Sequence, residues 1–258
     1  MAASVTIGNV EVLLLIDMVP PAYGALEFFH DLTDDSWAPY RDDCLEDGAF
    51  QLYYGCFALR SRGRVIMVDT GMGPGPHPTR GNRTGDLLNL LAGEGITPDQ
   101  VETVVHTHLH GDHVGWNVTH EGSTPRPTFP KARYLAPRAD WDYFTQPEVM
   151  ERFPYIGESV TPLESVGALD LIEGEHAVTP EVTTLPTPGH TPGHQSILIE
   201  SGGESAVITG DVLHTPAQLQ EPGWSFRADL DKAEAIASRQ TLIEKAVADN
   251  LTVAAGHL

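Results

Sequence analysis

The chain has 258 residues, of which 15 are Lys or Arg and 36 are Asp or Glu, so its formal charge is −21. Such an acidic surface repels phosphate groups, and we therefore expect no nucleic acid and no membrane as a partner. No run approaches the roughly 18 apolar residues of a membrane span, and the first residues lack the basic and apolar regions of a signal peptide.

The first half of the chain alternates apolar strands with one helix. Hydrophobic patterning predicts strands over 5–16, 51–60 and 64–68, a helix near 84–94, and a strand over 101–106. Polar segments without clear periodicity cover 19–48, 70–83 and 114–130. Loops of this length in a compact domain are usually functional, and we expect 19–48 to form a lid or a dimer contact.

The second half predicts further strands and one long helix. Strands are expected over 132–136, 182–185, 196–200 and 205–209, with a short helix around 139–145. Residues 229–249 form an amphipathic helix whose apolar face is Leu230, Ala233, Ile236, Ala237, Leu242, Ile243 and Val247. Strands followed by helices, twice, suit two sheets placed between helices. We expect one domain over 1–258.

The segment from His106 to His113 carries the strongest chemical signal. It contains four histidines and one aspartate directly after the apolar run of the 101–106 strand. Neutral imidazole and carboxylate are ligands for borderline divalent metals such as zinc. In an extended segment, residues two apart point to the same side, so His108, His110 and Asp112 can converge. One pair can then serve one metal, while Asp112 and His113 serve a second.

Three later segments offer further ligands. A turn rich in glycine and proline, 186–194, presents His190 from a rigid backbone, and we interpret His194 there as a structural residue. Asp211 follows a short apolar strand and a glycine, and its two oxygens can bridge two cations. His257 lies at the end of the apolar segment that begins at Leu251.

These motifs, together with Val68-Asp69-Thr70-Gly71, resemble in kind and order those of the metallo-β-lactamase superfamily of hydrolases. The resemblance implies an α+β fold, a four-layer αββα sandwich with the ligands at one edge. It also implies that Asp69 is a buried acid that braces the ligand loop. By the same resemblance, one metal is bound by His108, His110 and His190, the other by Asp112, His113 and His257, and Asp211 bridges them.

Three positions distinguish branches of this family. The flavodiiron branch has a glutamate where His110 stands, and many secreted zinc β-lactamases have a cysteine at the position of Asp211. Lactonases that degrade quorum signals often carry a tyrosine three residues after the bridging aspartate, where this chain has His214. The pattern resembles the branch that contains methyl parathion hydrolase and lactonase-like enzymes.

The expected activity is hydrolysis of a small-molecule ester or lactone by a bridging hydroxide, with Asp112 and His214 as catalytic residues. An N-acyl homoserine lactone or an aryl ester is the expected substrate, with promiscuous phosphotriesterase activity. The cofactor is two divalent ions, zinc first and manganese, cobalt or iron as alternatives. The alternatives are an organophosphate hydrolase, a β-lactamase, a thioesterase, or a non-catalytic metal-bearing sensor.

Further expectations concern the surroundings of the site. Aromatic side chains near the metal loop should line an apolar substrate pocket, drawn from Trp116, Phe129, Trp141, Tyr143 and Phe144. Cys44 and Cys56 form no C-x-x-C pair, which favours reduced thiols and a cytoplasmic setting. A homodimer is expected by analogy with related proteins.

Overall fold

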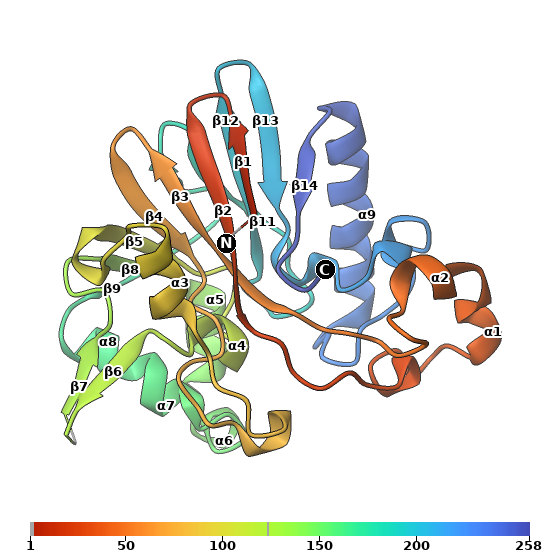
Figure 1. The fold of residues 1–258 in the computed structure, drawn as a ribbon, viewed down its shortest axis with the longest axis horizontal. Helices are drawn as coiled ribbons and strands as arrows, with labels where there is room; N and C mark the ends of the chain where they lie inside the picture. The colour runs from red at the N-terminus through yellow and green to blue at the C-terminus, as the bar shows by residue number, and fades with distance from the viewer. Residues whose placement is uncertain (1–2, 123) are drawn as a thin grey trace.

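Two β-sheets lie face to face at the centre of the computed structural model, which describes residues 3–122 and 124–258 (Figure 1). The larger sheet has seven strands in the order β1-β2-β3-β4-β5-β8-β9. Strands β1 to β4 pair antiparallel, whereas β4, β5, β8 and β9 are parallel. The bounds are β1 (Ala3–Ile7), β2 (Val10–Met18), β3 (Tyr54–Ser61), β4 (Arg64–Val68), β5 (Val101–Val105), β8 (Arg133–Pro137) and β9 (Leu169–Ile172).

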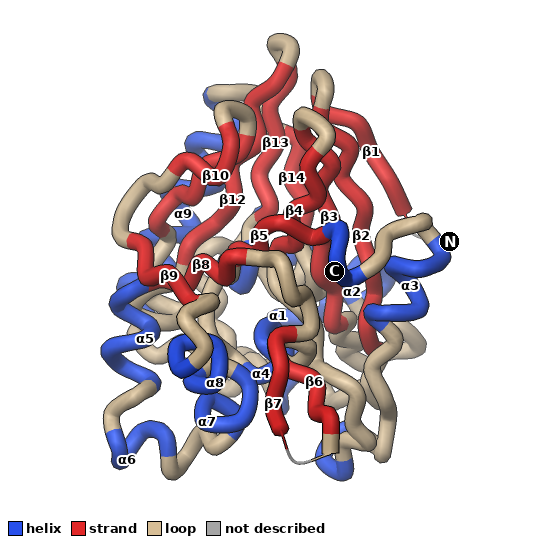
Figure 2. Tube along the Cα trace, turned by 90° about the vertical axis from the view of Figure 1, so that its left-hand side faces the viewer, coloured by secondary structure: helices blue, strands red, loops and turns tan. Residues whose placement is uncertain are grey.

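The smaller sheet has five strands in the order β10-β11-β12-β13-β14. All its neighbours are antiparallel except β13 and β14. The bounds are β10 (Ala177–Thr179), β11 (Val182–Pro186), β12 (Gln195–Ser201), β13 (Glu204–Ile208) and β14 (Thr252–Ala254). A separate antiparallel pair, β6 (Val118–Glu121) and β7 (Thr124–Pro127), projects away from both sheets (Figure 2).

Helices cover the outer faces and the edge where the loops gather. The bounds are α1 (Asp34–Trp37), α2 (Arg41–Cys44), α3 (Leu87–Gly93), α4 (Gly111–Val114), α5 (Arg138–Phe144), α6 (Pro147–Met150), α7 (Tyr155–Ser159), α8 (Thr161–Ser165) and α9 (Lys232–Ala248). Among the described residues, no helix is long and apolar enough to cross a membrane.

Alternation along the strands builds the layers, because successive side chains of a strand face opposite sides of its sheet. Val105 of β5 packs between the sheets with Ile208 of β13. Its neighbour Val104 packs outward in the cluster that holds α3 and α8. On the other side, Val207 faces outward against Leu242 of α9. The layers are therefore helix, sheet, sheet, helix, and the predicted αββα sandwich is confirmed.

Several predicted elements have different bounds in the structure. The strand expected over 5–16 is a hairpin, because the chain turns at Gly8, whose φ is +57°. The strand expected over 51–60 begins only at Tyr54. The patterning missed β6, β7, β9 and β10 and the helices α6 to α8. Each of these has five residues or fewer, too short to display a hydrophobic period.

The long helix α9 begins at Lys232, since the Asp231 side chain caps it by accepting from the Glu234 backbone N–H. Its buried side is not the predicted apolar face. Leu242 is buried as expected, but Val247, which was expected on the same face, is 78% exposed. Arg239, which was not expected on the buried side, is fully buried. The buried side of α9 thus includes a charged side chain, which supports the candidate functional site and does not belong to the apolar core.

The segment 19–48 has its own aromatic cluster. Phe28, Phe29 and Trp37 pack with Phe50 of the following loop and with Trp224 and Phe226. Rings of Phe28 and Phe226 stack at 5.2 Å between centroids. This segment, which holds α1 and α2, therefore lies against the loop between β13 and α9 (Figure 1).

Candidate metal centre

The loop after β5 begins extended and then turns into a helix. His108 and His110 point to the same side, as the extended geometry predicts, with His108 Nε2 3.0 Å from His110 Nδ1. The backbone departs from this geometry at His110, which is the residue before α4. Asp112 therefore does not converge with the two histidines but lies near His113 and His257. The short helix thus splits the motif between two groups.

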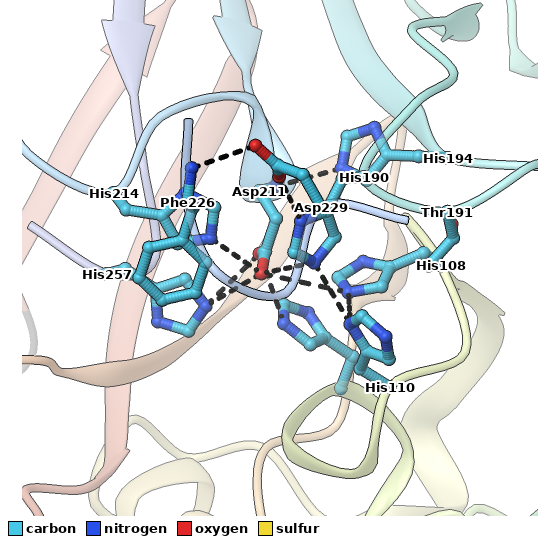
Figure 3. A network of polar contacts seen from close by, with 12 residues as sticks. His108, His110, His190, Thr191, His194, Asp211, His214, Phe226, Asp229 and His257 are labelled. Carbon is cyan, nitrogen blue, oxygen red and sulfur yellow. Dashed lines mark hydrogen bonds and ion pairs between the residues drawn. The ribbon is translucent and has the colours of Figure 1, made fainter. Parts of the chain in front are cut away.

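The first group, called here the His190 group, consists of His108, His110 and His190. His110 Nδ1 lies 3.0 Å from His190 Nε2, and His190 Nε2 lies 3.1 Å from Asp211 Oδ2. The ligand atoms of these histidines and Asp211 all lie within 4.8 Å of one another. The histidine from the turn after β11 thus reaches the two from the loop after β5 (Figure 3).

The second group, called here the His257 group, consists of Asp112, His113 and His257. Asp112 Oδ2 lies 3.8 Å from His113 Nε2 and 3.7 Å from His257 Nε2. The other oxygen of Asp211, Oδ1, lies 3.2 Å from His113 Nε2 and 3.1 Å from His257 Nε2. Asp211 Oδ2, which faces His190, also lies 3.2 Å from His257 Nε2, so the Asp211 carboxylate contacts both groups, as a bridging carboxylate must.

The donor set fits divalent cations. Asp211 Oδ1 and His113 Nε2 are buried and have no hydrogen-bond partner, although unpaired buried polar atoms are costly. In the His190 group, three ring nitrogens face one another across 3.0 Å. A cation coordinated by these lone pairs satisfies them all, and imidazole with carboxylate suits zinc and its first-row neighbours. The described residues therefore offer two adjoining places for a metal ion.

The electrostatics hold two of the histidines, His108 and His110, in the neutral form that binds metals. Burial, reinforced by neighbouring histidines, lowers the pKa of His108 and of His110 well below the ordinary value. Both rings are therefore neutral and offer lone pairs. Burial also lowers the pKa of His190, but the charges of Asp211 and Asp229 outweigh it and raise the pKa to about 9. A cation bound at His190 must displace this proton.

Asp69 fastens the ligand loop to β4. Its carboxylate accepts from the Thr107 backbone N–H at 2.8 Å and from the Thr107 hydroxyl at 2.7 Å. It also accepts from His113 Nδ1 at 2.8 Å, which turns the His113 Nε2 towards Asp211. Asp69 adopts φ of +62°, an uncommon conformation for a residue with a side chain. It therefore occupies the bracing position that the sequence implied.

His194 holds the backbone of Asp211. Its Nε2 accepts from the Asp211 N–H at 2.9 Å, and its Nδ1 donates to the Thr187 carbonyl at 3.0 Å. Burial, with His190 nearby, lowers the pKa of His194 to about 3, so the ring stays neutral in this arrangement. This is the structural role expected from the sequence. The neighbouring Gly210 has φ of +55°, and a Cβ there would lie 2.6 Å from His194 Nε2.

Two buried aspartates that the sequence did not single out support the site. Asp229 Oδ1 accepts from His190 Nδ1 at 2.9 Å, and its Oδ2 accepts from the Phe226 N–H at 2.9 Å. The guanidinium of Arg239 lies 3.7 Å from the same carboxylate. No local motif marks Asp229, which lies only two residues before the cap of α9. It orients the ring of His190, as partners of metal-bound histidines do.

Asp140 of α5 connects the two loops that carry the His190 group. Its Oδ2 accepts from the Leu109 N–H and from the Thr191 hydroxyl, both at 2.9 Å. Its Oδ1 accepts from the Gly193 N–H at 2.6 Å. The carboxylate is fully buried. Leu109 lies between His108 and His110, and Thr191 follows His190, so one side chain fixes both ligand loops.

His214 lies beside Asp211 and contacts a second cavity, which Glu46, Tyr53 and His257 also line. Its Nε2 is 3.1 Å from Asp211 Oδ2, and its ring stacks on Phe226 at 3.7 Å between centroids (Figure 3). The side chain is buried, and its Nδ1 has no hydrogen-bond partner. His214, Asp211 and His257 form a third group whose geometry allows metal binding.

A cavity of about 210 Å³ opens over both groups and contacts His110, Asp112, His190, Asp211 and His257. Its aromatic wall differs from the expected one. Trp116 and Phe129 pack in the core under the larger sheet, and Phe144, at the end of α5, packs in the cluster that holds Ile156 of α7. The aromatic residues that line the cavity come from other segments and are Phe28, Tyr54, Phe153, Tyr155 and Phe226.

Comparisons with known proteins agree with this geometry. An N-acyl homoserine lactonase from Bacillus sp is 28% identical over 220 residues, which cover 78% of this chain and 80% of the relative. A solved structure of AidC, a dizinc quorum-quenching lactonase with a bound product, superposes with a TM-score of 0.86 at 21% identity, covering 100% of this chain and 90% of that chain. The solved structure of the hydrolase AbOPH superposes with a TM-score of 0.84 at 23% identity, and the superposition covers 100% of this chain and 90% of that chain.

The family itself follows from a match over most of the chain. Residues 55–257, from the start of β3 to His257, match the sequence profile of the metallo-beta-lactamase superfamily. That range holds every residue of the two groups, Asp211 and the bracing Asp69. The predicted family and its hydrolase class are confirmed, and this chain belongs to the metallo-beta-lactamase superfamily.

Proposed function

We propose that the chain is a dinuclear-metal hydrolase that opens the ring of N-acyl homoserine lactones. The observation that carries this proposal is the position of Asp211, whose two oxygens face the His190 group and the His257 group at the floor of one cavity. The similarity to N-acyl homoserine lactonases supports the choice of a lactone as substrate.

The proposed ligands follow the two groups. His108, His110 and His190 hold one cation, Asp112, His113 and His257 hold the other, and Asp211 bridges them. When bound, the pair supplies Lewis acidity and lowers the pKa of coordinated water to about 7. Zinc is the proposed metal, with manganese, cobalt and iron as the alternatives that the same ligands accept.

We assign the proton transfer to Asp112. Its carboxylate is 23% exposed and lines the cavity, whereas Asp211 is buried. It can accept the proton of the attacking water and deliver it to the leaving alkoxide, which completes the ring opening. His214 contacts Asp211 Oδ2 through its Nε2, and its proposed role is to hold the bridging carboxylate in position.

The remaining expectations belong to the same proposal. The chain forms one domain, binds a small molecule and no nucleic acid, is cytoplasmic, and forms a homodimer in which segment 19–48 is a lid or part of the contact. The thiols of Cys44 and Cys56 are free in the structure.

The test combines metal analysis with a substrate panel. Purified protein should contain about two transition ions per chain and open N-hexanoyl-homoserine lactone. Paraoxon, a penicillin and a thioester serve as competing substrates, and a higher kcat/KM on one of them would replace the lactone as the main substrate. The double substitution H108A/H110A should abolish turnover. Full activity in that variant, or metal-free protein that stays inactive when metals are supplied, would refute the proposal.

A further inference from the structure

An arginine from the loop after β4 lines the cavity. Arg80 ends a short 3-10 helix, Pro78–Arg80, in the loop after β4, and it lines the same cavity as His110, Asp112 and His257. Its guanidinium carbon lies 5.8 Å from the centroid of the Tyr54 ring. In a chain with 15 basic residues and a charge of −21, a guanidinium beside the proposed reaction centre points to a binding role.

The polar atoms around Arg80 have spare hydrogen-bonding capacity. Arg80 Nε and the Tyr23 hydroxyl are both buried, and neither has a hydrogen-bond partner among the described residues. Arg80 Nη1 reaches the Thr79 carbonyl at 3.4 Å, and Tyr54, Tyr23 and Asp112 are the other polar side chains near the guanidinium. A guanidinium carries five N–H donors in a planar fork that matches carbonyl and carboxylate oxygens. Donors without partners at a cavity wall indicate a ligand oxygen.

The rest of the wall is mainly apolar, and Tyr54 and Tyr155 are its other side chains with a hydroxyl group. Phe28, Leu52, Phe153 and Phe226 are apolar. The second arginine there, Arg227, is exposed, lies over the Phe28 ring at 4.6 Å, and donates to the Glu27 carbonyl. Arg80 is therefore the cavity's cationic anchor with unpaired donors.

We propose that Arg80 binds an acceptor oxygen on the non-reacting arm of the substrate, an amide carbonyl or a carboxylate. The chain then selects lactones that carry such an arm over lactones with a hydrocarbon arm of equal length. This inference rests on the proposed lactonase function, and it adds a specificity-determining residue that the ligand motifs do not contain. The apolar wall takes the remaining carbon chain of the arm.

The test compares three γ-butyrolactones of matched length, with an acylamide arm, a carboxyl-ended arm or an alkyl arm. The enzymes are the metal-loaded wild type, R80Q, R80K and the control R83Q, which changes an exposed arginine of the same loop. R80Q should lower kcat/KM about 10- to 100-fold, mainly through KM, on the lactone whose oxygen Arg80 binds. On the alkyl lactone, kcat/KM of R80Q should stay within about twofold of the wild-type value. R80K should recover part of the loss, because it keeps the charge but not the fork.

Of the acylamide and carboxyl-ended lactones, the one with the larger loss of kcat/KM in R80Q shows which oxygen Arg80 binds, the amide carbonyl or the carboxylate. Either result supports the proposal. Equal losses on all three lactones, or no loss on any, would overturn it while leaving the lactonase function in place. Calorimetric binding of the ring-opened product N-hexanoyl-L-homoserine gives a readout without turnover, and R80Q should weaken it relative to R83Q. If the wild type opened no lactone at all, the proposed function would fail, and this binding comparison would still decide the role of Arg80.

Discussion

His190 Nδ1 lies 2.9 Å from the carboxylate of Asp229, which is itself buried beside Arg239. Arg239 donates to the carbonyls of Val212 and Trp224 and so ties α9 to the loop after β13. A chain of contacts therefore runs from the long helix to one proposed metal ligand. The helix that covers the smaller sheet also fixes the orientation of the His190 ring.

Replacing Asp229 with alanine should weaken metal binding. The substitution leaves the His190 N–H without its acceptor, so the ring loses its fixed orientation, and loss of such a partner costs about 10- to 100-fold in metal affinity. Competition with a zinc indicator measures the change. The matched control is D231A, which removes the cap of α9 and should cost about 1 kcal/mol of stability but leave metal affinity intact. Wild-type affinity in D229A would contradict this role.

Replacing Asp140 with asparagine should destabilise both ligand loops. The carboxylate accepts three hydrogen bonds, from Leu109, Thr191 and Gly193, and an amide has only one acceptor oxygen. At least one buried donor is left facing an NH2 group, which costs about 1–3 kcal/mol. Urea unfolding of D140N measures the loss. An unchanged free energy of unfolding would show that Asp140 does not hold the loops.

The same carboxyl group gives a pH dependence with a defined sign. Burial raises the pKa of Asp140 to about 6 in the folded chain, above its ordinary value of 3.8. A raised pKa contributes stability below about pH 4, and this contribution is lost as pH rises through 6. The amount by which the free energy of unfolding of the wild type exceeds that of D140N should therefore fall between pH 4 and pH 7, by on the order of 3 kcal/mol. A difference that stays constant with pH would disprove the shift.

The residues that the fold brings together in the His190 group and the His257 group could be singled out from the sequence because their signal is local. His108, His110, Asp112 and His113 share one loop, and the glycine and proline residues around His190 mark a rigid turn. The order of elements along the chain, strands followed by helices, twice, predicted the two sheets placed between helices. Asp140 and Asp229 could not be found in this way. Their partners lie 31 to 53 and 39 residues away, and only the folded chain brings them together.

The errors also have physical causes. The aromatic residues near the metal loop in sequence were expected at the cavity, but Trp116 and Phe129 are core residues. Phe28 and Phe226 line it instead, since segment 19–48 folds back on the loop before α9. The apolar face predicted for α9 ignored Arg239, whose Nε and Nη1 donate to the backbone carbonyls of Val212, Pro222 and Trp224.

Removing the metals should destabilise the chain. Without cations, the ring nitrogens of His108, His110 and His190 face one another at 3.0 Å in a buried site. A ligand present at 1,000 times its dissociation constant stabilises the folded state by about 4 kcal/mol. Calorimetry with and without a chelator should show a lower Tm for the stripped protein. The variant H108A/H110A should show a much smaller chelator effect, and an equal effect in both proteins would place the metals elsewhere.

The glycine before Asp211 tests how tightly the bridging carboxylate is held. Gly210 and Gly203 both have positive φ, of +55° and +85°, so alanine costs backbone strain of about 1–2 kcal/mol at either position. At Gly203 no atom lies within 4 Å of the added Cβ, whereas at Gly210 it meets His194 Nε2 at 2.6 Å and Thr107 Cβ at 3.0 Å. G210A must therefore displace His194, which holds the Asp211 N–H.

We expect G203A to lower stability by the strain alone and to bind metal like the wild type. G210A should lose more stability and also lose metal affinity, because Asp211 no longer presents its oxygens to both groups. Urea unfolding and a zinc-indicator titration on the two variants separate strain from displacement. If G210A matched G203A in both measurements, the contact between His194 and the Asp211 backbone would not position the bridge.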